Sequence, residues 1–362
     1  MYLKTIQEIL KISWPEVYDN SLKDDKGLGE SIFGIEIEVE NIVNNVTLPF
    51  GWEGKEDGSL RNNGVEFITS PAKAKATPFL LTSLKSALEE AGNIPSYSPR
   101  TSIHIHLNVL DFTVEQLKSF VLLYLCFESV LFKYVGGNRK DSIFCIPLSH
   151  AGYVGNLKRF FSLSEERDRL YNTSDKWHKY TSLNLKPMCS FGTIEFRHMP
   201  GTDDIDKLID WITLIIKVKE FSLVNTKEEV YKMCKDLNTS SQYEVFTSNV
   251  FGEARKLLTS NLQKEMENDI THIKECFEEA ENTEIDFSLF ETSSLFKVNE
   301  FVAIDFSERT KYLMSLSKEA LTVELQRLSS LYAKALIKED QEKILIEYRE
   351  VEKVLYNFDW DA

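Results

Sequence analysis

The chain has 362 residues, of which 43% are hydrophobic, so it can form two domains, or one large domain with an appendage. A formal net charge of −15 argues against a general nucleic-acid-binding protein. The five cysteines have no CxxC spacing, which indicates reduced thiols rather than a disulfide framework or a zinc site. The most apolar run, from Phe120 to Phe127, is too short to cross a bilayer, and the N-terminus has no signal pattern. We therefore expect a cytoplasmic protein without a membrane segment.

The first 225 residues predict strands interleaved with helices. Residues 1–31 favour a short helix followed by a polar loop. Strands are expected near 32–40, 64–69, 102–109, 181–186 and 191–198. Helices are expected over 74–91, from Asp111 or Thr113 to Tyr134, and over 203–221. Because the gaps between strands hold either helices or long polar loops, the sheet need not be parallel.

The pattern changes after residue 225. Apolar residues recur every three or four positions, which is typical of amphipathic helices with charged outer faces. These runs extend from Leu258 to Phe277, from Leu321 to Tyr332 and from Ile344 to Leu355. We therefore predict three parts: an N-terminal helix and loop over 1–31, a domain of strands and helices over 32–225, and a mainly helical appendage over 226–362. The apolar stripes of the appendage need a partner surface, which could be a second subunit.

Charged side chains alternate with branched or aromatic residues on four of the strand-like segments. Alternate residues of a strand share a face, so each segment buries one face and presents acids, imidazoles or a guanidinium on the other. The residues on the polar faces are Glu36, Glu38, Glu40, Glu66, His104, His106, Asn108, Glu195 and Arg197. Because buried like charges cannot otherwise stay ionised, a sheet with this many inward acids must hold cations.

Each piece has a simpler interpretation when it is taken alone. The glutamates that begin at Glu36 fit a solvated amphipathic strand, and Glu195 with Arg197 fits a cross-sheet ion pair. Arg139 follows a glycine pair, where it could contact an anion or end a solvated helix. Asp57 begins an Asp-Gly-Ser turn signal and indicates little more.

The joint occurrence of these groups favours a binding site. Hard oxygen ligands suit Mg²⁺ or Mn²⁺, and Mg²⁺ is usually held by carboxylates together with substrate phosphates. A nearby arginine suits bidentate contact with a phosphate. The sequence therefore predicts a site for a metal-bound nucleoside triphosphate that has neither a Walker loop nor a kinase glycine loop.

Four segments in order also resemble a known family, the amidoligases. They are Gly34-Ile35-Glu36-Ile37-Glu38, Glu66-Phe67-Ile68-Thr69-Ser70-Pro71, His104-Ile105-His106 and Thr193-Ile194-Glu195-Phe196-Arg197-His198-Met199-Pro200-Gly201-Thr202. Amidoligases are carboxylate–amine ligases of phages, bacteria and fungi with the glutamine synthetase and glutamate–cysteine ligase fold, and the resemblance covers about residues 32–203. It implies an α+β fold: a curved, mostly antiparallel sheet with outer helices. Its concave face would bind ATP and two or three Mg²⁺ ions, with Mn²⁺ as an alternative.

The resemblance also implies roles for individual residues. The metal-binding glutamates match Glu36, Glu38, Glu66 and Glu195. Nucleotide-binding positions match His104, His106, Asn108 and Arg197, and catalytic positions match Arg197, Arg139 and His106. The family often has Cys-Gly or Ser-Gly before its first histidine, where this chain has Thr101-Ser102, and it often has arginine at the position of Lys179. These departures concern contacts on the substrate side rather than the metal ligands.

The function that the resemblance implies is ATP-dependent ligation over residues 32–225. A carboxylate attacks the γ-phosphate of ATP, and an amine then converts the acyl phosphate to an amide. The partners would be ATP, a carboxylate and an amine on a small molecule, peptide or modified base. Two alternatives stay open from the residues: a metal-dependent hydrolase or oxygenase that uses His104 and His106, and a non-catalytic metal-binding interaction protein. The sequence identifies neither substrate and no general base.

Overall fold

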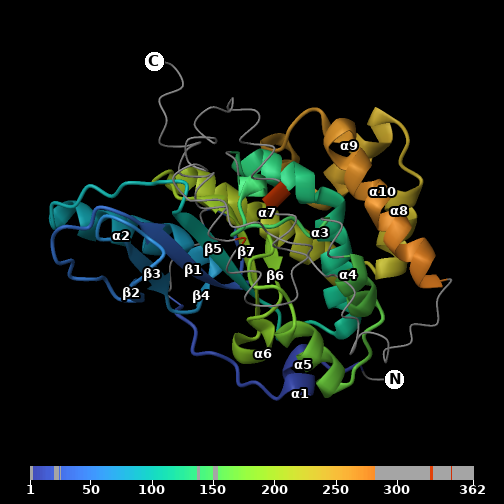
Figure 1. Ribbon diagram of the computed structural model, residues 1–362, viewed down its shortest axis with the longest axis horizontal. Helices are drawn as coiled ribbons and strands as arrows, with labels where there is room; N and C mark the ends of the chain where they lie inside the picture. Colours follow the sequence, from blue (N-terminus) through green and yellow to red (C-terminus); the bar gives the residue numbers. More distant parts are fainter. Residues whose placement is uncertain are drawn as a thin grey trace, which may run out of the picture.

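A seven-stranded antiparallel sheet forms the centre of the structure (Figure 1). The computed structural model describes residues 3–19, 24, 26–136, 139–149 and 154–281, together with 327, 328 and 344. The strands are β1 (Ile32–Val39), β2 (Trp52–Glu56), β3 (Val65–Thr69), β4 (Ala72–Lys73), β5 (Ser102–Asn108), β6 (Leu183–Asn184) and β7 (Thr193–Pro200). Their order is β2-β3-β1-β5-β7-β6, and β4 pairs with the beginning of β1.

Helices cover one face of the sheet, and further helices lie beyond one end of it (Figure 1). The α-helices of the described part are α1 (Ile6–Leu10), α2 (Thr77–Glu90), α3 (Val114–Val135), α4 (Val154–Phe161), α5 (Arg167–Asp175), α6 (Met188–Phe191), α7 (Ile205–Val224), α8 (Lys227–Lys235), α9 (Ser240–Phe251) and α10 (Leu262–Glu281). Helices α2, α3 and α7 form the layer behind the sheet: Ile37 faces α2 and α7, and the ring of Phe196 contacts Phe120 of α3 and Trp211 of α7. The main core lies between this layer and the strands.

Helix α3 shows how local sequence and packing together define an element. Its N-cap is Thr113, whose side chain accepts a hydrogen bond from the Gln116 backbone N–H while Gln116 bonds back to Thr113, a capping box worth about 1 kcal/mol. Gly136, with a φ of +71°, follows its last turn. The helix is buried along most of its length because α7 and β7 pack against it, as do α8 and α10. The apolar run from Phe120 to Phe127 is therefore a buried helix.

The structure confirms the antiparallel sheet and most of the predicted strands and long helices. It adds β2 and β4, which the sequence analysis did not predict. In β2, the four residues after Trp52 are exposed, so this edge strand lacks the alternation on which the prediction relied. Helices α4, α5 and α6 were not predicted either. The repeats over 321–332 and 344–355 lie outside the described residues, apart from Arg327, Leu328 and Ile344.

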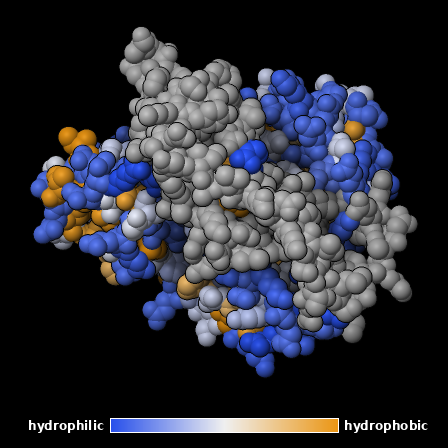
Figure 2. All heavy atoms as spheres, viewed as in Figure 1, coloured by the Kyte–Doolittle hydropathy of each residue, from blue (hydrophilic) through white to orange (hydrophobic). Residues whose placement is uncertain are grey.

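Exposed hydrophobic residues gather at one end of the molecule. In Figure 2 they cluster at the end of the molecule that Figure 1 labels α2, β2 and β3. Exposed large hydrophobic residues of this part of the chain include Val43, Phe50, Phe79 and Ile94. None of these four lines the polar cavity described below. Among the described residues, no helix has the length and apolar character needed to cross a membrane.

Candidate active site

A polar cavity of about 420 Å³ lies on the face of the sheet opposite the helix layer. The strands contribute Glu36 and Glu38 from β1, Glu66 from β3, Ser102, His104 and His106 from β5, Asn184 from β6, and Glu195 and Arg197 from β7. Loops add Asp57, Ser59, Arg100, Phe144, Lys179 and Tyr180. All four predicted metal-binding glutamates, both histidines and Arg197 therefore line one cavity.

The strand register explains why these side chains meet. Glu36 lies opposite His104, and Glu38 lies opposite Glu66. His106 lies opposite Glu195 on the next strand pair. Directly opposed residues of antiparallel strands have neighbouring Cβ atoms on the same face, so the alternation along each strand becomes a cluster across the sheet.

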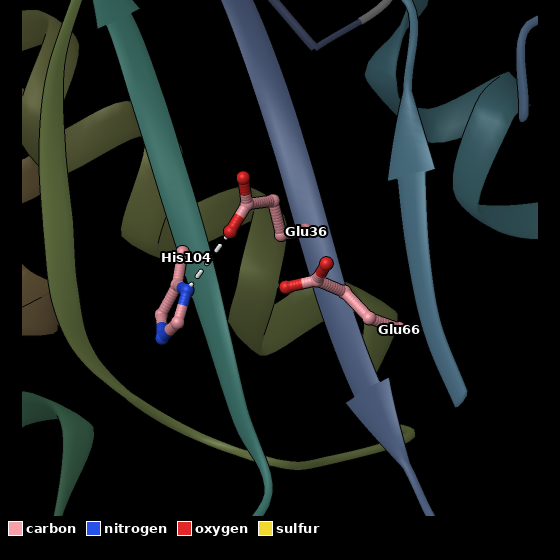
Figure 3. A group of neighbouring side chains, drawn as sticks. All are labelled: Glu36, Glu66 and His104. Carbon is pink, nitrogen blue, oxygen red and sulfur yellow. Dashed lines mark hydrogen bonds and ion pairs between the residues drawn. The ribbon is translucent and has the colours of Figure 1, made fainter. Parts of the chain in front are cut away.

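Glu36 is the centre of the cluster. His104 Nδ1 lies 3.0 Å from Glu36 Oε2, and His106 Nε2 lies 3.1 Å from Glu36 Oε1. Figure 3 shows Glu36 reaching toward His104, with the Glu66 carboxylate pointing to the same space. Burial alone would raise the pKa of Glu36, but the hydrogen bond with His104 and the close approach of His106 hold that pKa well below its usual range. Glu36 is therefore a carboxylate in the folded protein.

Glu195 is held from three directions. Its Oε1 pairs with Arg197 Nη1 and lies 3.3 Å from His104 Nδ1, and its Oε2 accepts a hydrogen bond of 2.6 Å from Asn184 Nδ2. Burial works against ionisation here, but the charge of Arg197 and then that of the histidines lower the pKa of Glu195. The Glu195–Arg197 pair lies within β7 and faces the cavity, so it is not the cross-sheet ion pair that was the simpler interpretation.

A second group of acids lies beside the first. Glu38, Asp57 and Glu66 each bring a carboxylate oxygen within 4.8 Å of the others. Glu38 accepts hydrogen bonds from the Ser102 backbone N–H at 2.7 Å and from Ser102 Oγ at 2.6 Å. Burial, followed by the negative charge of Glu36, raises the pKa of Glu66 to about 7. This group concentrates negative charge at one end of the cavity.

Asp57 and His104 differ from their sequence-based interpretations. Asp57 was seen only as a turn, but the β2–β3 turn brings it to Glu38 and Glu66. The pairing of β2 with β3 would have indicated that Asp57 reaches the cavity, but β2 itself was not predicted. The resemblance assigned His104 to the nucleotide, which stays a prediction, and the structure also places its ring among Glu36, Glu66 and Glu195. It is therefore also a candidate metal ligand.

The donor set fits divalent cations. Three groups have ligand atoms within 4.8 Å of one another: Glu36, Glu66 and His104; Glu36, His106 and Glu195; and Glu38, Asp57 and Glu66. The first two groups share Glu36, and the first and third share Glu66, so the three groups adjoin one another. Mostly carboxylate oxygen donors suit Mg²⁺ or Mn²⁺ better than a thiolate-preferring metal.

Glu40 and Arg139 lie outside the cavity lining. Glu40 is 3% exposed, and its Oε1 accepts the Arg61 backbone N–H at 2.9 Å, so it secures the β2–β3 turn instead of continuing the row of Glu36 and Glu38. Arg139 Nη2 donates to the Arg197 carbonyl at 3.0 Å, behind the cavity. Contact of Arg139 with a phosphate stays a prediction.

A second cavity, of about 410 Å³, adjoins the first and shares Glu36 and His106 with it. Its lining is more apolar and includes Ile32, Ile68, Phe191, Asn108 and Thr193. His106 Nδ1 lies 3.0 Å from Thr193 Oγ1. The Asn108 Nδ2 group is buried and has no hydrogen-bond partner among the described residues, although Asn108 Oδ1 accepts the Leu110 N–H. Because Asn108 lines this cavity, its buried Nδ2 is a candidate donor to a ligand.

Comparison with known proteins shows that the chain matches a protein family over the region that forms this site. A family model described as "Putative amidoligase enzyme" matches residues 13–219, which is more than half of the chain. The match includes every residue that lines the two cavities except Ile12. A comparison with curated proteins gave no match.

Proposed function

Because this chain belongs to the amidoligase family, whose members are amide-bond-forming ligases, we propose that it is an ATP-dependent carboxylate–amine ligase acting through an acyl phosphate. The proposal includes a structural relationship of its sheet to that of glutamine synthetase. Two adjoining cavities support it most directly. One is lined by carboxylates and an arginine, the other is largely apolar, and His106 lies at their shared wall.

The two cavities suit different parts of the reactants. The nucleoside of ATP would occupy the apolar cavity, where the unpartnered Asn108 Nδ2 offers a donor. The triphosphate would pass His106 into the polar cavity. The carboxylate substrate would enter from the side of Arg100, Lys179 and Tyr180. In this arrangement the γ-phosphate lies between the substrate and the ADP leaving group, as in-line transfer requires.

Metal ligands would come from the carboxylates and histidines of the polar cavity. Glu36, Glu66, His104 and Glu195 would hold ions near Arg197, and Glu38 with Asp57 would complete a further position. When bound, Mg²⁺ or Mn²⁺ ions neutralise phosphate charge and hold it in line for transfer. Arg197 adds a planar cation whose Nε is fixed by the Phe144 carbonyl and whose Nη1 is fixed by Glu195.

The proposed reaction proceeds without a covalent bond between enzyme and substrate. A substrate carboxylate oxygen bonds to the γ-phosphorus while the bond to the ADP oxygen breaks. The amine nitrogen then attacks the acyl carbon, phosphate leaves with the activated oxygen, and the amine loses a proton to solvent. Arg197 would stabilise the charge that develops on the transferred phosphoryl group. The described cysteines do not line the polar cavity, and the mechanism needs no thiol.

Calorimetry of ATP binding tests the proposal. ATP should bind in the presence of Mg²⁺ or Mn²⁺ and lose most of its affinity in excess chelator. A thermal-shift series with Mg-ATP, Zn²⁺ and Ca²⁺ separates the alternatives: Mg-ATP should stabilise the protein most. Stabilisation by Zn²⁺ with no response to Mg-ATP would favour a metal-dependent hydrolase that uses His104 and His106. Equal ATP affinity with and without chelator would refute the metal-bridged site.

A further inference from the structure

A buried carboxylate behind the sheet has no role in the chemistry described so far. Glu128 of α3 is 1% exposed and does not line the polar cavity. Its Oε1 accepts hydrogen bonds from Tyr124 Oη, Ser182 Oγ and the Leu148 backbone N–H, each 2.7 Å long. Its Oε2 accepts the Ser149 backbone N–H at 2.8 Å. One carboxylate thus joins a helix to two separate chain segments.

Both segments continue directly to Arg197. The Ser182 carbonyl accepts the Arg197 backbone N–H at 2.9 Å, and the Ser182 N–H donates to the Ile146 carbonyl at 2.7 Å. The segment that ends at Leu148 and Ser149 also carries Phe144, whose carbonyl accepts Arg197 Nε at 3.1 Å. One connection therefore holds the backbone of Arg197, and the other holds its guanidinium.

Tyr124 extends the connection to the next residue of β7. Its Oη lies 2.8 Å from His198 Nε2 as well as 2.7 Å from Glu128 Oε1. His198 is fully buried, and burial followed by the charge of Arg139 lowers its pKa to about 3. His198 is therefore neutral and contributes no charge to the network behind Arg197. A buried carboxyl group that accepts four hydrogen bonds holds its four donors in fixed positions relative to one another.

We propose that Glu128 is a positioning residue that fixes the Arg197 guanidinium in the orientation required for phosphoryl transfer. Without the Phe144 carbonyl held in place, the Arg197 guanidinium keeps its pairing with Glu195 and its contact with the Tyr180 ring, but no group then fixes its Nε. Phosphoryl transfer depends on preorganised charge, so a small change in this orientation costs rate rather than substrate affinity. The proposal rests on the proposed function only for the role of Arg197.

Asp269 of α10 supplies a matched control. It is 3% exposed and accepts hydrogen bonds from the backbone N–H and Oγ of Ser129, the residue after Glu128, both at 2.8 Å. It resembles Glu128 in burial and in accepting a backbone N–H, but its hydrogen bonds connect α10 to α3 and do not reach Arg197. Substituting either carboxylate by its amide should lower stability, and only the Glu128 change should affect the position of Arg197.

Steady-state ATP hydrolysis by the full chain with Mg²⁺ provides the first measurement. Glu128→Gln should lower kcat on the order of 10- to 100-fold and change the KM for Mg-ATP less than about 3-fold, because a preorganised contact is lost and the binding groups are kept. Asp269→Asn should keep kcat within about 3-fold of wild type, because its hydrogen bonds to Ser129 do not lead to Arg197. Equal kcat values for the two variants would overturn the proposal.

A double substitution distinguishes positioning from general destabilisation. When Arg197→Lys is already present, Glu128→Gln should lower kcat by less than about a further 3-fold. The guanidinium through which Glu128 acts is then already absent. If the two losses multiply, Glu128 does not act through Arg197. Should Glu128→Gln fail to fold, Tyr124→Phe and Ser182→Ala each remove one donor to the same oxygen. Wild-type kcat in both of these milder variants would also count against the proposal.

Hydrogen exchange tests the positioning when no turnover can be measured. In Glu128→Gln, the amides of Leu148, Ser149 and Arg197 should exchange at least about 10-fold faster than in Asp269→Asn, because their acceptors are lost or loosened. The β3 amides serve as an internal reference. Unchanged exchange at these three amides would contradict the inference. Absence of ATP turnover in the wild-type protein would contradict the proposed function alone.

Discussion

The carboxylates at the two ends of the polar cavity have different charged neighbours. At one end, which we term the histidine end, Glu36 and Glu195 are paired with His104, His106 and Arg197. At the other, the acid end, Glu38, Asp57 and Glu66 face one another. The pKa of Glu36 lies well below its usual range, whereas burial and then the charge of Glu36 raise that of Glu66 to about 7.

The difference indicates which half depends on bound ions. The histidine end has its charges matched by its own side chains, so its geometry is held before any ion binds. The acid end has no such partner among its three residues, so like charges repel until a cation arrives. We therefore expect metal binding to organise the acid end, and catalysis to depend most steeply on the histidine end.

The largest effect should follow substitution at the histidine end. Arg197→Lys should lower ATP turnover on the order of 100-fold or more while the fold is kept, because lysine provides a point charge and not a planar pair of donors. Glu195→Gln should behave similarly. Circular dichroism melts and an ADP-release assay measure the two quantities separately.

The control for Arg197→Lys is Arg255→Lys. Arg255 also pairs with a glutamate, Glu244, at 2.7 Å, but outside the cavity. It should lose some stability and no turnover per folded molecule. If Arg197→Lys gives that same pattern, the Glu195–Arg197 pair is structural.

Metal affinity should be the next largest effect, and it should come from the acid end. Glu66→Gln and Asp57→Asn should each weaken Mg²⁺ binding about 10-fold or more, since loss even of a group that only supports a metal ligand typically costs this much. In excess chelator, Glu66→Gln should raise the melting temperature, because a repelling charge is removed. Glu36→Gln should lower it, because two histidine contacts are lost. Melting shifts of the same sign for these two variants would remove the distinction between the ends.

The pH dependence of the metal-free protein should be smaller and has a defined sign. The folded-state pKa of Glu66, about 7, exceeds the usual glutamate pKa of 4.5. The unfolded chain therefore releases this proton first, and the contribution of Glu66 to stability falls as pH rises from about 4.5 to 7. Urea melts in chelator should show this fall in wild type and not in Glu66→Gln. Saturating Mg²⁺ should remove it, since the ion favours the carboxylate.

The smallest effect should come from the residue that joins the two ends. Ser102 Oγ lies 2.6 Å from Glu38 Oε2 and 2.9 Å from His104 Nε2. Ser102→Ala keeps the backbone hydrogen bond to Glu38 and should weaken Mg²⁺ binding only about 3- to 10-fold, the equivalent of one hydrogen bond. Calorimetric titration measures this. A loss as large as that in Glu66→Gln would mean that the ends form one unit.

The site was predictable from the sequence where its residues follow a strand period. Glu36, Glu38, Glu66, His104, Glu195 and Arg197 alternate with apolar neighbours, and alternation alone assigns them a common face. The antiparallel sheet was implied by the family resemblance, and the long helices α3 and α7 were predictable from their apolar runs and, for α3, from a cap signal at Thr113. These features depend on residues close together in the chain.

What could not be predicted depends on contacts between distant segments. Asp57 reaches the cavity only because β2 pairs with β3, and the exposed residues of β2 carry no alternating pattern. Glu40 continues the spacing of Glu36 and Glu38 but binds the Arg61 backbone. Glu128 ended an apolar run in the sequence, and its partners at Leu148 and Ser182 follow from the fold alone.

The register of β1 against its neighbours also affects the stability of misfolded forms in which the strands are misaligned. Shifting β1 by one residue relative to β3 or β5 would turn Glu36 and Glu38 toward the helix layer and turn Ile35 and Ile37 toward the cavity. Each carboxylate left unpaired in that layer would cost several kcal/mol. The acids that serve the chemistry thus also penalise misaligned strands, and a single-residue insertion within β1 should lose the site and the native sheet together.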